Sequence, residues 1–201
     1  MKRGAKNEGG LYLIDVTLTP ITWIIAPRVD KLVVQRYIQA GYFKDEEAKH
    51  LDRVFPRALV DGKPVPIILK KWIHAAMWRA CELMGIDKEL ARRFVIIDDN
   101  DFPVDFIVIP GEPLRHRRVV FLGKESRSTE YFEFIDNTFK LKFKVVTDVD
   151  PATFCNILYG AGKIGIMAYT RHGYGKFTIE VKVSEYKGKI SRELFNYLVS
   201  K

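Results

Sequence analysis

Three stretches in the C-terminal half decide the fold: Phe139-Lys-Leu-Lys-Phe-Lys-Val145, Gly160-Ala-Gly-Lys-Ile-Gly165 and Arg171-His-Gly-Tyr-Gly-Lys-Phe177. In the first, apolar and lysine side chains alternate, which is the period of a strand with one buried face. The other two stretches together hold five glycines and four basic side chains. Glycine lets a backbone approach a ligand closely, and exposed N–H groups beside basic side chains bind anions. The two glycine-rich stretches therefore predict a loop that binds phosphate groups.

The rest of the chain supplies the order of the elements. Alternating apolar residues predict strands, and apolar residues at i, i+3 and i+4 predict helices. Gly85 is expected to end the first long helix, and Asp148 or Asp150 to cap the next one. The expected elements are strands over 11–19, 139–145 and 177–183 and helices over 67–84, 151–159 and 191–199.

This order is β-α-β-β-α-β with insertions. It predicts a single α+β domain over residues 1–201, with a ferredoxin-like (RRM-like) sheet covered by helices on one face. The stretch 28–66 is a long excursion with short helical pieces. A second insertion is expected at about 94–134, where short strands surround an acidic and a basic element.

Composition narrows the class of protein. With 201 residues, 47% hydrophobic and 29% charged, the chain is typical of one globular domain. A net charge of +8 favours a polyanionic partner, of which nucleic acid is the commonest. Cys81 and Cys155 lie far apart and indicate a reducing, intracellular setting. The stretch 11–19 alternates around Asp15, so it predicts a strand rather than a signal peptide, and the protein is expected to be cytoplasmic.

Several catalytic and cofactor classes are not supported. Gly160, Gly162 and Gly165 match the spacing of a dinucleotide fingerprint, but a helical segment precedes them where that fold requires a strand. The acidic residues over 98–105 break the calcium-loop pattern and favour a solvated turn. The four histidines show no metal-ligand spacing, so no metal and no cofactor are predicted.

Two basic clusters leave two interpretations open. Lys70, Lys71 and His74 lie near the expected start of a helix, where phosphate binds well, but they equally suit a solvated helix face. Arg115 and Arg117 belong to a dense basic cluster in a hairpin or loop, for which binding and solvation are also both open.

The chain resembles the RAMP superfamily of CRISPR proteins, and most of all the repeated crRNA-binding backbone subunit of type III and related effector complexes. Three segments carry this resemblance in order along most of the chain. A departure occurs over 67–69, where apolar residues replace small polar ones. The segments are Leu11-Tyr-Leu-Ile-Asp-Val-Thr-Leu-Thr-Pro20 with Ile25-Ala-Pro-Arg28, Asp61-Gly-Lys-Pro-Val-Pro66 with the helix through Arg79, and Thr170-Arg-His-Gly-Tyr-Gly-Lys-Phe-Thr-Ile-Glu-Val181.

The resemblance implies a subunit that binds guide RNA and oligomerises along it for antiviral target recognition. Its partners would be single-stranded guide RNA, complementary target nucleic acid, copies of itself and other effector subunits. The excursion over 28–66 would act as a thumb that interrupts base pairing. Expected RNA contacts come from Arg28, Lys70, Lys71, His74, Arg115, Arg117, Lys163, Arg171, His172 and Lys176, with Gly160, Gly162, Gly165, Gly173 and Gly175 forming the glycine loop.

Two other functions stay open. In members of the superfamily that cut target RNA, an aspartate in the loop after the first strand does so, and Asp30 lies near that place; only such cleavage would call for Mg²⁺. A repeat-RNA processing endoribonuclease of the same superfamily would use a histidine base, for which His50 or His74 is available. A generic RRM-like RNA-binding module is the third possibility.

Overall fold

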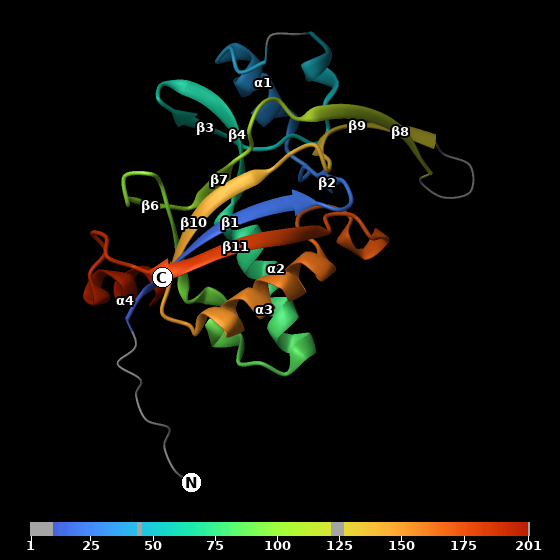
Figure 1. Ribbon diagram of the computed structural model, residues 1–201. Helices are drawn as coiled ribbons and strands as arrows, with labels where there is room; N and C mark the ends of the chain where they lie inside the picture. The colour runs from blue at the N-terminus through green and yellow to red at the C-terminus, as the bar shows by residue number, and fades with distance from the viewer. Residues whose placement is uncertain (1–9, 44–45, 122–126, 201) are drawn as a thin grey trace.

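The central sheet of the computed structural model (Figure 1) is antiparallel and has the strand order β11-β1-β10-β5-β6, in a mixed α+β fold. The structure describes residues 10–43, 46–121 and 127–200; parts of both expected insertions, 44–45 and 122–126, lie outside this description. The strands of this sheet are β1 (Tyr12–Pro20), β5 (Phe94–Ile97), β6 (Pro103–Val104), β10 (Leu141–Thr147) and β11 (Phe177–Glu185).

Strands β1 and β10 lie side by side inside this sheet, and in both strands apolar and polar side chains alternate. Their antiparallel register sets Val16 opposite Phe143 on one face and Asp15 opposite Lys144 on the other. Because side chains alternate along a strand, the apolar set points to one side and the charged set to the other. The predicted strands are confirmed, with ends shifted by one or two residues.

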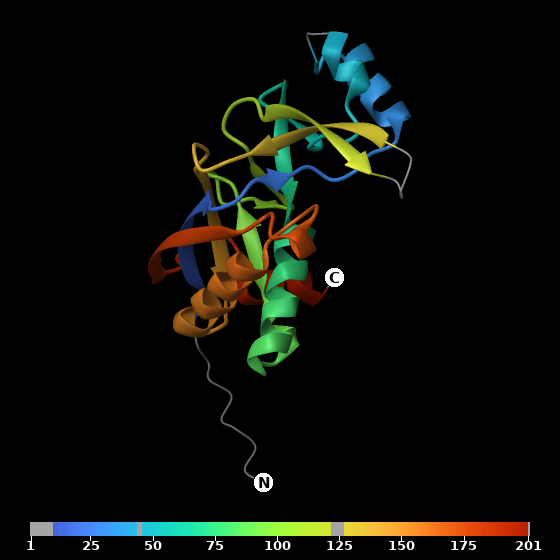
Figure 2. The same cartoon turned by 90° about the vertical axis from the view of Figure 1, so that its right-hand side faces the viewer.

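Two helices, α2 (Lys70–Met84) and α3 (Pro151–Ile164), cover the apolar face (Figures 1 and 2). Together with β1, β5, β10 and β11 they run in the chain order β1, α2, β5, β10, α3, β11. Gly85 ends α2 in the left-handed conformation, as predicted. Asp150, rather than Asp148, caps α3 and accepts the Thr153 N–H at 2.9 Å.

Two helix boundaries differ from the prediction. The first helix begins at Lys70 rather than at residue 67, because 67–69 end strand β4 (Lys63–Leu69) and pair with β7 (Phe106–Val108). The second helix continues beyond residue 159 to Ile164, so Gly160 and Gly162 are helical and not part of a loop. Packing against neighbouring elements decides where α2 begins and where α3 ends. The local sequence pattern carries no information about that packing.

The opposite face of the sheet is covered at one end by α4 (Arg192–Ser200). Phe195 and Val199 pack there on Val95 and Val146, which point away from α2 and α3. Asp148 lies nearby and forms ion pairs with Arg93 and Arg192.

Two three-stranded sheets and α1 lie together on the far side of the central sheet from α2 and α3 (Figure 2). The expected excursion 28–66 folds as α1, η1, β3 and most of β4, and the expected insertion 94–134 contributes β5 and β6 to the central sheet. The elements not yet given are β2 (Ile24–Ile25), α1 (Lys31–Gln39), η1 (Glu46–His50), β3 (Arg57–Val60), η2 (Lys88–Arg92), β8 (Leu114–Phe121), β9 (Arg127–Ile135) and η3 (Thr170–His172).

A buried ion pair joins these sheets. The Arg57 guanidinium of β3 lies 2.8 Å from the Glu133 carboxylate of β9, and the two side chains are 1% and 0% exposed. Among the described residues, no helix combines the length and the apolar character that crossing a membrane requires.

Candidate nucleic-acid interface

A groove of about 440 Å³ forms where four segments that are distant in sequence meet. Its walls are the residues that follow β2, Arg53 before β3, one side of α2 and the loop after α3. Three arginines line it, Arg28, Arg53 and Arg79, and no acidic side chain among the described residues does. Guanidinium groups bind phosphate in a bidentate manner, so this lining favours a polyanion, although Arg53 and Arg79 each also pair with a glutamate, Glu130 and Glu82.

Spacing on α2 explains how Arg79 reaches the groove. Trp72, Ala75, Ala76 and Arg79 lie at i, i+3, i+4 and i+7, so they share one helix face, and all four line the groove. The small alanines leave the floor open, and the Arg79 side chain is 58% exposed and pairs with Glu82. The groove therefore has an apolar floor with cationic edges.

The loop after α3 forms one wall of the groove, and two segments of this loop make unusually close backbone contacts with each other. A Cβ on Gly165 would lie 2.6 Å from the Tyr174 carbonyl oxygen, and one on Gly175 would lie 2.2 Å from that of Ile166. The Ile166 N–H donates to the Gly175 carbonyl at 3.0 Å. These glycines let two strands of the loop pack together, and Gly162 does the same where α3 crosses Phe177. Their first role is close packing.

Tyr169 holds this loop against the β8–β9 hairpin. Its backbone is left-handed, with φ of 60°, which is strained for a residue other than glycine. Two guanidinium carbons lie over its ring, that of Arg53 at 4.4 Å and that of Arg118 at 4.0 Å from the ring centroid. Its hydroxyl donates to Glu130 at 2.7 Å and accepts from Arg53 at 2.9 Å. Cation–π contacts and charge-assisted hydrogen bonds thus compensate the strain.

Glu130 is the carboxylate at the centre of this network. Burial by itself raises its pKa, but hydrogen bonds from Tyr169 and Arg53, with the charges of Arg53 and Arg118, bring the pKa below its ordinary value. Glu130 is therefore ionised, and it neutralises part of the charge of Arg53 and Arg118. Arg28, which the network does not include, keeps its exposed position at the groove.

The predicted basic residues of the glycine loop lie beside the groove. Arg171 and His172 form the exposed turn η3 directly after Thr170, which lines the groove. Lys176 is half-buried, and its backbone N–H donates to the Thr22 hydroxyl at 3.0 Å. Lys163 is exposed near the end of α3, with its ammonium 4.7 Å from the Tyr159 ring centroid. Of the predicted basic residues in this part of the molecule, Arg28 lines the groove itself, and Lys163 and Arg171 are chain neighbours of the lining residues Ile164 and Thr170.

Lys70, Lys71 and His74 lie elsewhere. With Arg92, they line a separate hollow of about 480 Å³ on another side of α2, next to α4. Burial lowers the pKa of Lys70, against the opposing effect of Asp105. Burial, followed by the charges of Lys70 and Arg92, lowers the pKa of His74, so this imidazole is neutral at pH 7. Its Nε2 atom is buried and meets no hydrogen-bond partner in the described part of the chain.

The remaining predicted residues lie around the hairpin and α1. Arg115 and Arg117 lie on β8. The guanidinium carbon of Arg115 is 5.5 Å from the Phe43 ring centroid, and that of Arg117 is 5.4 Å from the Tyr131 ring centroid. His50 also lies beside Tyr131, with ring centroids 6.1 Å apart. Asp30 caps α1, where its carboxylate accepts the Leu32 N–H at 2.8 Å. Asp30 and His50 are not among the residues that line the groove, and His74 lines the separate hollow.

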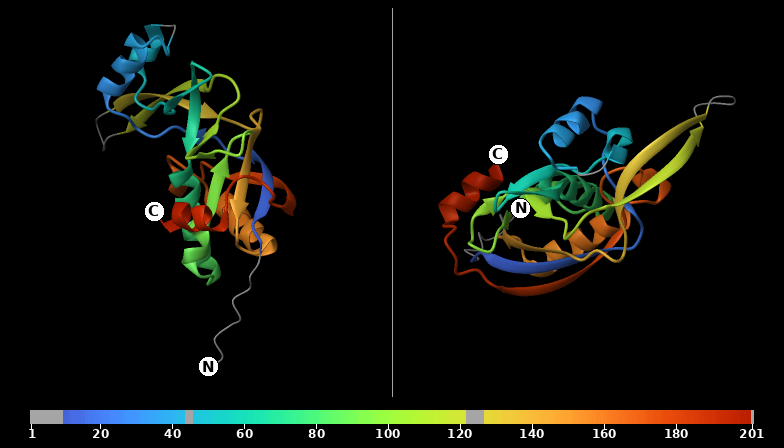
Figure 3. Two further views of the ribbon diagram at one scale, coloured as in Figure 1. Left: turned by 90° about the vertical axis from the view of Figure 1, so that its left-hand side faces the viewer. Right: turned by 90° about the horizontal axis from the view of Figure 1, so that it is seen from above.

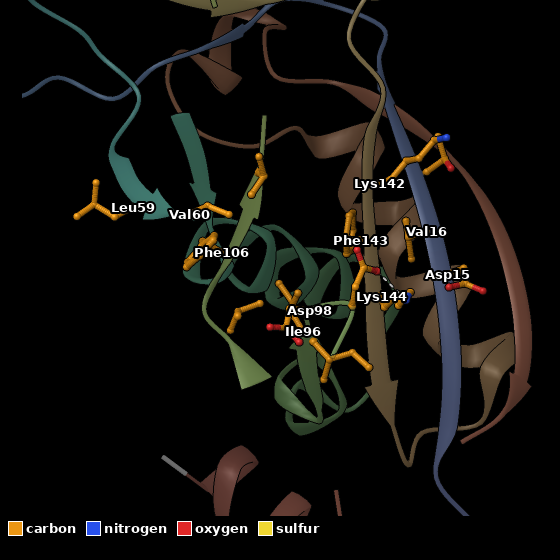
Figure 4. A pocket seen from close by; sticks show the side chains of 15 residues that line it. Asp15, Val16, Leu59, Val60, Ile96, Asp98, Phe106, Lys142, Phe143 and Lys144 are labelled. Carbon is orange, nitrogen blue, oxygen red and sulfur yellow. Dashed lines mark hydrogen bonds and ion pairs between the residues drawn. The ribbon is translucent and has the colours of Figure 1, made fainter. Parts of the chain in front are cut away.

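Another cavity, of about 700 Å³, has a different character (Figure 4). It lies between the open face of the central sheet and β3, β6 and β7, and its wall includes Val60 and Phe106. Three aspartates, at positions 15, 98 and 99, outnumber its two lysines, Lys142 and Lys144. Asp99 pairs with Lys144 at 2.8 Å. This mixed charge does not favour a polyanion.

No group of three or more potential metal-ligating side chains occurs within the described ranges. The acidic turn after β5 is organised by its own hydrogen bonds, since Asp98 accepts the N–H groups of Asn100 and Phe102 at 2.9 and 2.8 Å.

Sequence reasoning missed Arg53, Arg79, Arg118 and Tyr169. For Arg79 a signal existed in the sequence, because the i, i+7 spacing from Trp72 places both residues on the same face of the helix. For Arg53 and Tyr169 none existed, because their contact joins positions 116 residues apart.

The chain is similar to known proteins in fold and not detectably in sequence. No protein-family model matches the chain, and no curated protein is detectably similar in sequence. Among solved structures, the chain is similar to a chain in "Cryo-EM structure of the Type III-B Cmr-beta bound to cognate target RNA". The TM-score is 0.61 at 11% identity, over 88% of this chain and 61% of that one. The two share a fold, and this chain spans about three fifths of the length of its neighbour.

Proposed function

We propose that this protein is a guide-RNA (crRNA) binding subunit of a CRISPR ribonucleoprotein effector complex, in which copies assemble along the RNA. The observation that carries the proposal is the arginine-lined groove. Each of the three segments that resemble the RAMP superfamily contributes to its lining, through Arg28, the helix face that ends at Arg79, and Thr170. Likeness of fold to a chain of the Cmr-beta complex, whose structure contains target RNA, supports it.

The proposal includes a ferredoxin-like core. The order β1, α2, β5, β10, α3, β11 supports this assignment, as does an antiparallel sheet with β1 and β10 between β11 and β5. The additional sheets then lie on the side of the sheet opposite its helices, where they are free to contact RNA or a neighbouring subunit.

In this proposal the RNA is held by its backbone. Arg28 and Arg79 contact phosphates at the edges of the groove, and Arg171, His172 and Lys176 extend the same basic track. Trp72 and the alanines of the floor contact sugars or bases without hydrogen-bonding selectivity. Sequence is then specified by base pairing within the RNA, and the protein contributes position and affinity.

Purification without nuclease tests the proposal. We expect particles larger than one chain that carry protected RNA of stepped length, because each added subunit covers a further stretch. The R28A/R79A variant should lose this RNA. K142A is the matched control, since Lys142 lies on the opposite sheet face in the acidic cavity. An RNA-free wild-type protein that also fails to bind added single-stranded RNA would contradict the proposal.

The neutral, half-buried His74 supports a second candidate, metal-independent RNA cleavage, because a general base must be unprotonated. Cleavage of a repeat RNA in the presence of a metal chelator, lost in H74A and kept in H50A, would favour that function. Mg²⁺-dependent cleavage lost in D30A would instead favour a slicing subunit.

A further inference from the structure

Strand β11 forms one edge of the central sheet, and among the described residues no strand lies on its outer side. Figure 3 shows it along the rim of the molecule when seen from above. It has nine residues, of which the last six, from Glu180 to Glu185, are all exposed. An exposed edge strand presents unpaired N–H and C=O groups to another strand.

Hydrogen bonds at both ends of β11 show which backbone groups point outward. The Tyr186 N–H donates to the Leu11 carbonyl, and the Ile21 N–H to the Lys176 carbonyl, both at 2.8 Å. In an antiparallel pair, alternate residues direct both backbone groups to the same side. Even-numbered residues of β11 therefore face β1, and Ile179, Val181 and Val183 direct their N–H and C=O groups to the free edge.

The side chains of these odd-numbered residues form an uncovered apolar strip. Val181 and Val183 lie in register with Val16 and Ile14 of β1, so they are on the helix-covered face. There Val16 and Ile14 are 2% and 0% exposed, but Val181 and Val183 remain 40% and 43% exposed. The apolar face of the sheet thus continues onto this part of β11, where α2 and α3 no longer cover it.

We propose that β11 pairs with β11 of a second copy of this chain, antiparallel about a two-fold axis at Val181. In this register Glu180 of each copy lies opposite Lys182 of the other, and Ile179 lies opposite Val183. Opposite charges and β-branched residues are favourable cross-strand partners. A pairing centred on Ile179 would instead oppose Lys182 to Lys176, and one centred on Val183 would oppose Glu180 to Tyr186.

This contact is separate from the proposed assembly along RNA. A two-fold pairing is closed, since the same strand serves both copies, whereas repetition along a guide requires two different surfaces. The pairing also uses no residue of the arginine-lined groove. It therefore joins two copies in the absence of nucleic acid.

Sedimentation velocity of nuclease-treated, RNA-free protein over a range of concentrations tests the proposal. We expect a reversible dimer. K182E or E180K sets like charges opposite each other twice, and self-association should weaken about tenfold. A mixture of these two variants re-forms both Glu–Lys pairs and should dimerise again. K142E, on the central strand β10, is the matched control and should dimerise like the wild type.

A backbone variant completes the test. V181P removes an outward N–H that makes no bond to β1, so the fold should persist while the dimer is lost. A circular dichroism spectrum and melting curve would establish that the variant is folded. The proposal is overturned if the wild type is monomeric at every concentration, if folded V181P dimerises normally, or if the mixed charge variants associate no better than each alone.

Discussion

Replacement of Arg57 by alanine should destabilise the protein strongly and in a pH-dependent way. The Arg57 guanidinium makes two contacts with Glu133, at 2.8 and 3.2 Å, and both side chains are almost fully buried. Two unit charges about 4 Å apart attract by roughly 4 kcal/mol at an effective dielectric constant of about 20. Removing one partner of a buried pair costs about 3–5 kcal/mol. We therefore expect R57A to lose about 3–5 kcal/mol of unfolding free energy at pH 7.

The pH dependence identifies the cause. Burial raises the pKa of Glu133, while Arg57, the Phe55 N–H and Arg115 act against that increase without cancelling it. An acid with a raised pKa in the folded state makes stability fall as pH rises from its unfolded pKa through its folded one. Without Arg57 the pKa of Glu133 rises further, so the deficit of R57A should shrink as the pH is lowered and Glu133 becomes protonated.

Urea unfolding at several pH values, followed by circular dichroism, measures both effects. The R57A/E133Q variant removes both charges of this buried pair, so its stability should depend less on pH than that of R57A. The matched control is R79A, which removes an exposed arginine and should change stability by about 1 kcal/mol or less. An R57A deficit of about 1 kcal/mol that is the same at every pH would refute the reasoning.

Three further predictions concern the groove and its supports. G162A should destabilise the fold by about 1–3 kcal/mol, because its Cβ would meet the Phe177 carbonyl at 2.3 Å, whereas the same change in an open helix stabilises; thermal melting gives the sign. Y169F should cost about 1–3 kcal/mol in urea unfolding, since Glu130 and Arg53 each lose a hydrogen-bond partner, and a cost near zero would show that the hydroxyl does not hold the loop. D150A removes the α3 cap and should cost about 1 kcal/mol in the same assay, with D150N retaining most of the stability.

The central part of the fold follows from local pattern. The strands around Val16, Phe143 and Val181 alternate cleanly; those around Val16 and Phe143 bury the apolar face that this alternation predicts, whereas Val181 stays 40% exposed at the edge of the sheet. Helix α2 was predicted from its apolar stripe, but its start was not. Residues 67–69 pack as a strand on β7 because that contact, made with a segment some forty residues later, outweighs the helical pattern.

The candidate site was predicted in part. Arg28 and Thr170 belong to segments singled out in the sequence, and both line the groove; the basic residues Arg171 and His172 directly follow Thr170. Lys70, Lys71 and His74 do not join them, because the helix that carries them presents two different faces to two hollows. Helical periodicity alone would have predicted that these residues lie on a different face of α2 from Arg79. The contacts of Tyr169 could not be predicted, because they depend on tertiary structure.

The central claim is that RNA phosphates bind in the arginine-lined groove. The most direct measurement is the affinity for single-stranded RNA at several salt concentrations, for wild type, R28A/R79A and K142A. Each phosphate contact on a single strand contributes about 0.7 to the slope of log affinity against log salt. We predict that R28A/R79A binds more weakly and has a slope smaller by about 1.4, while K142A matches the wild type. An unchanged slope in R28A/R79A would contradict the account.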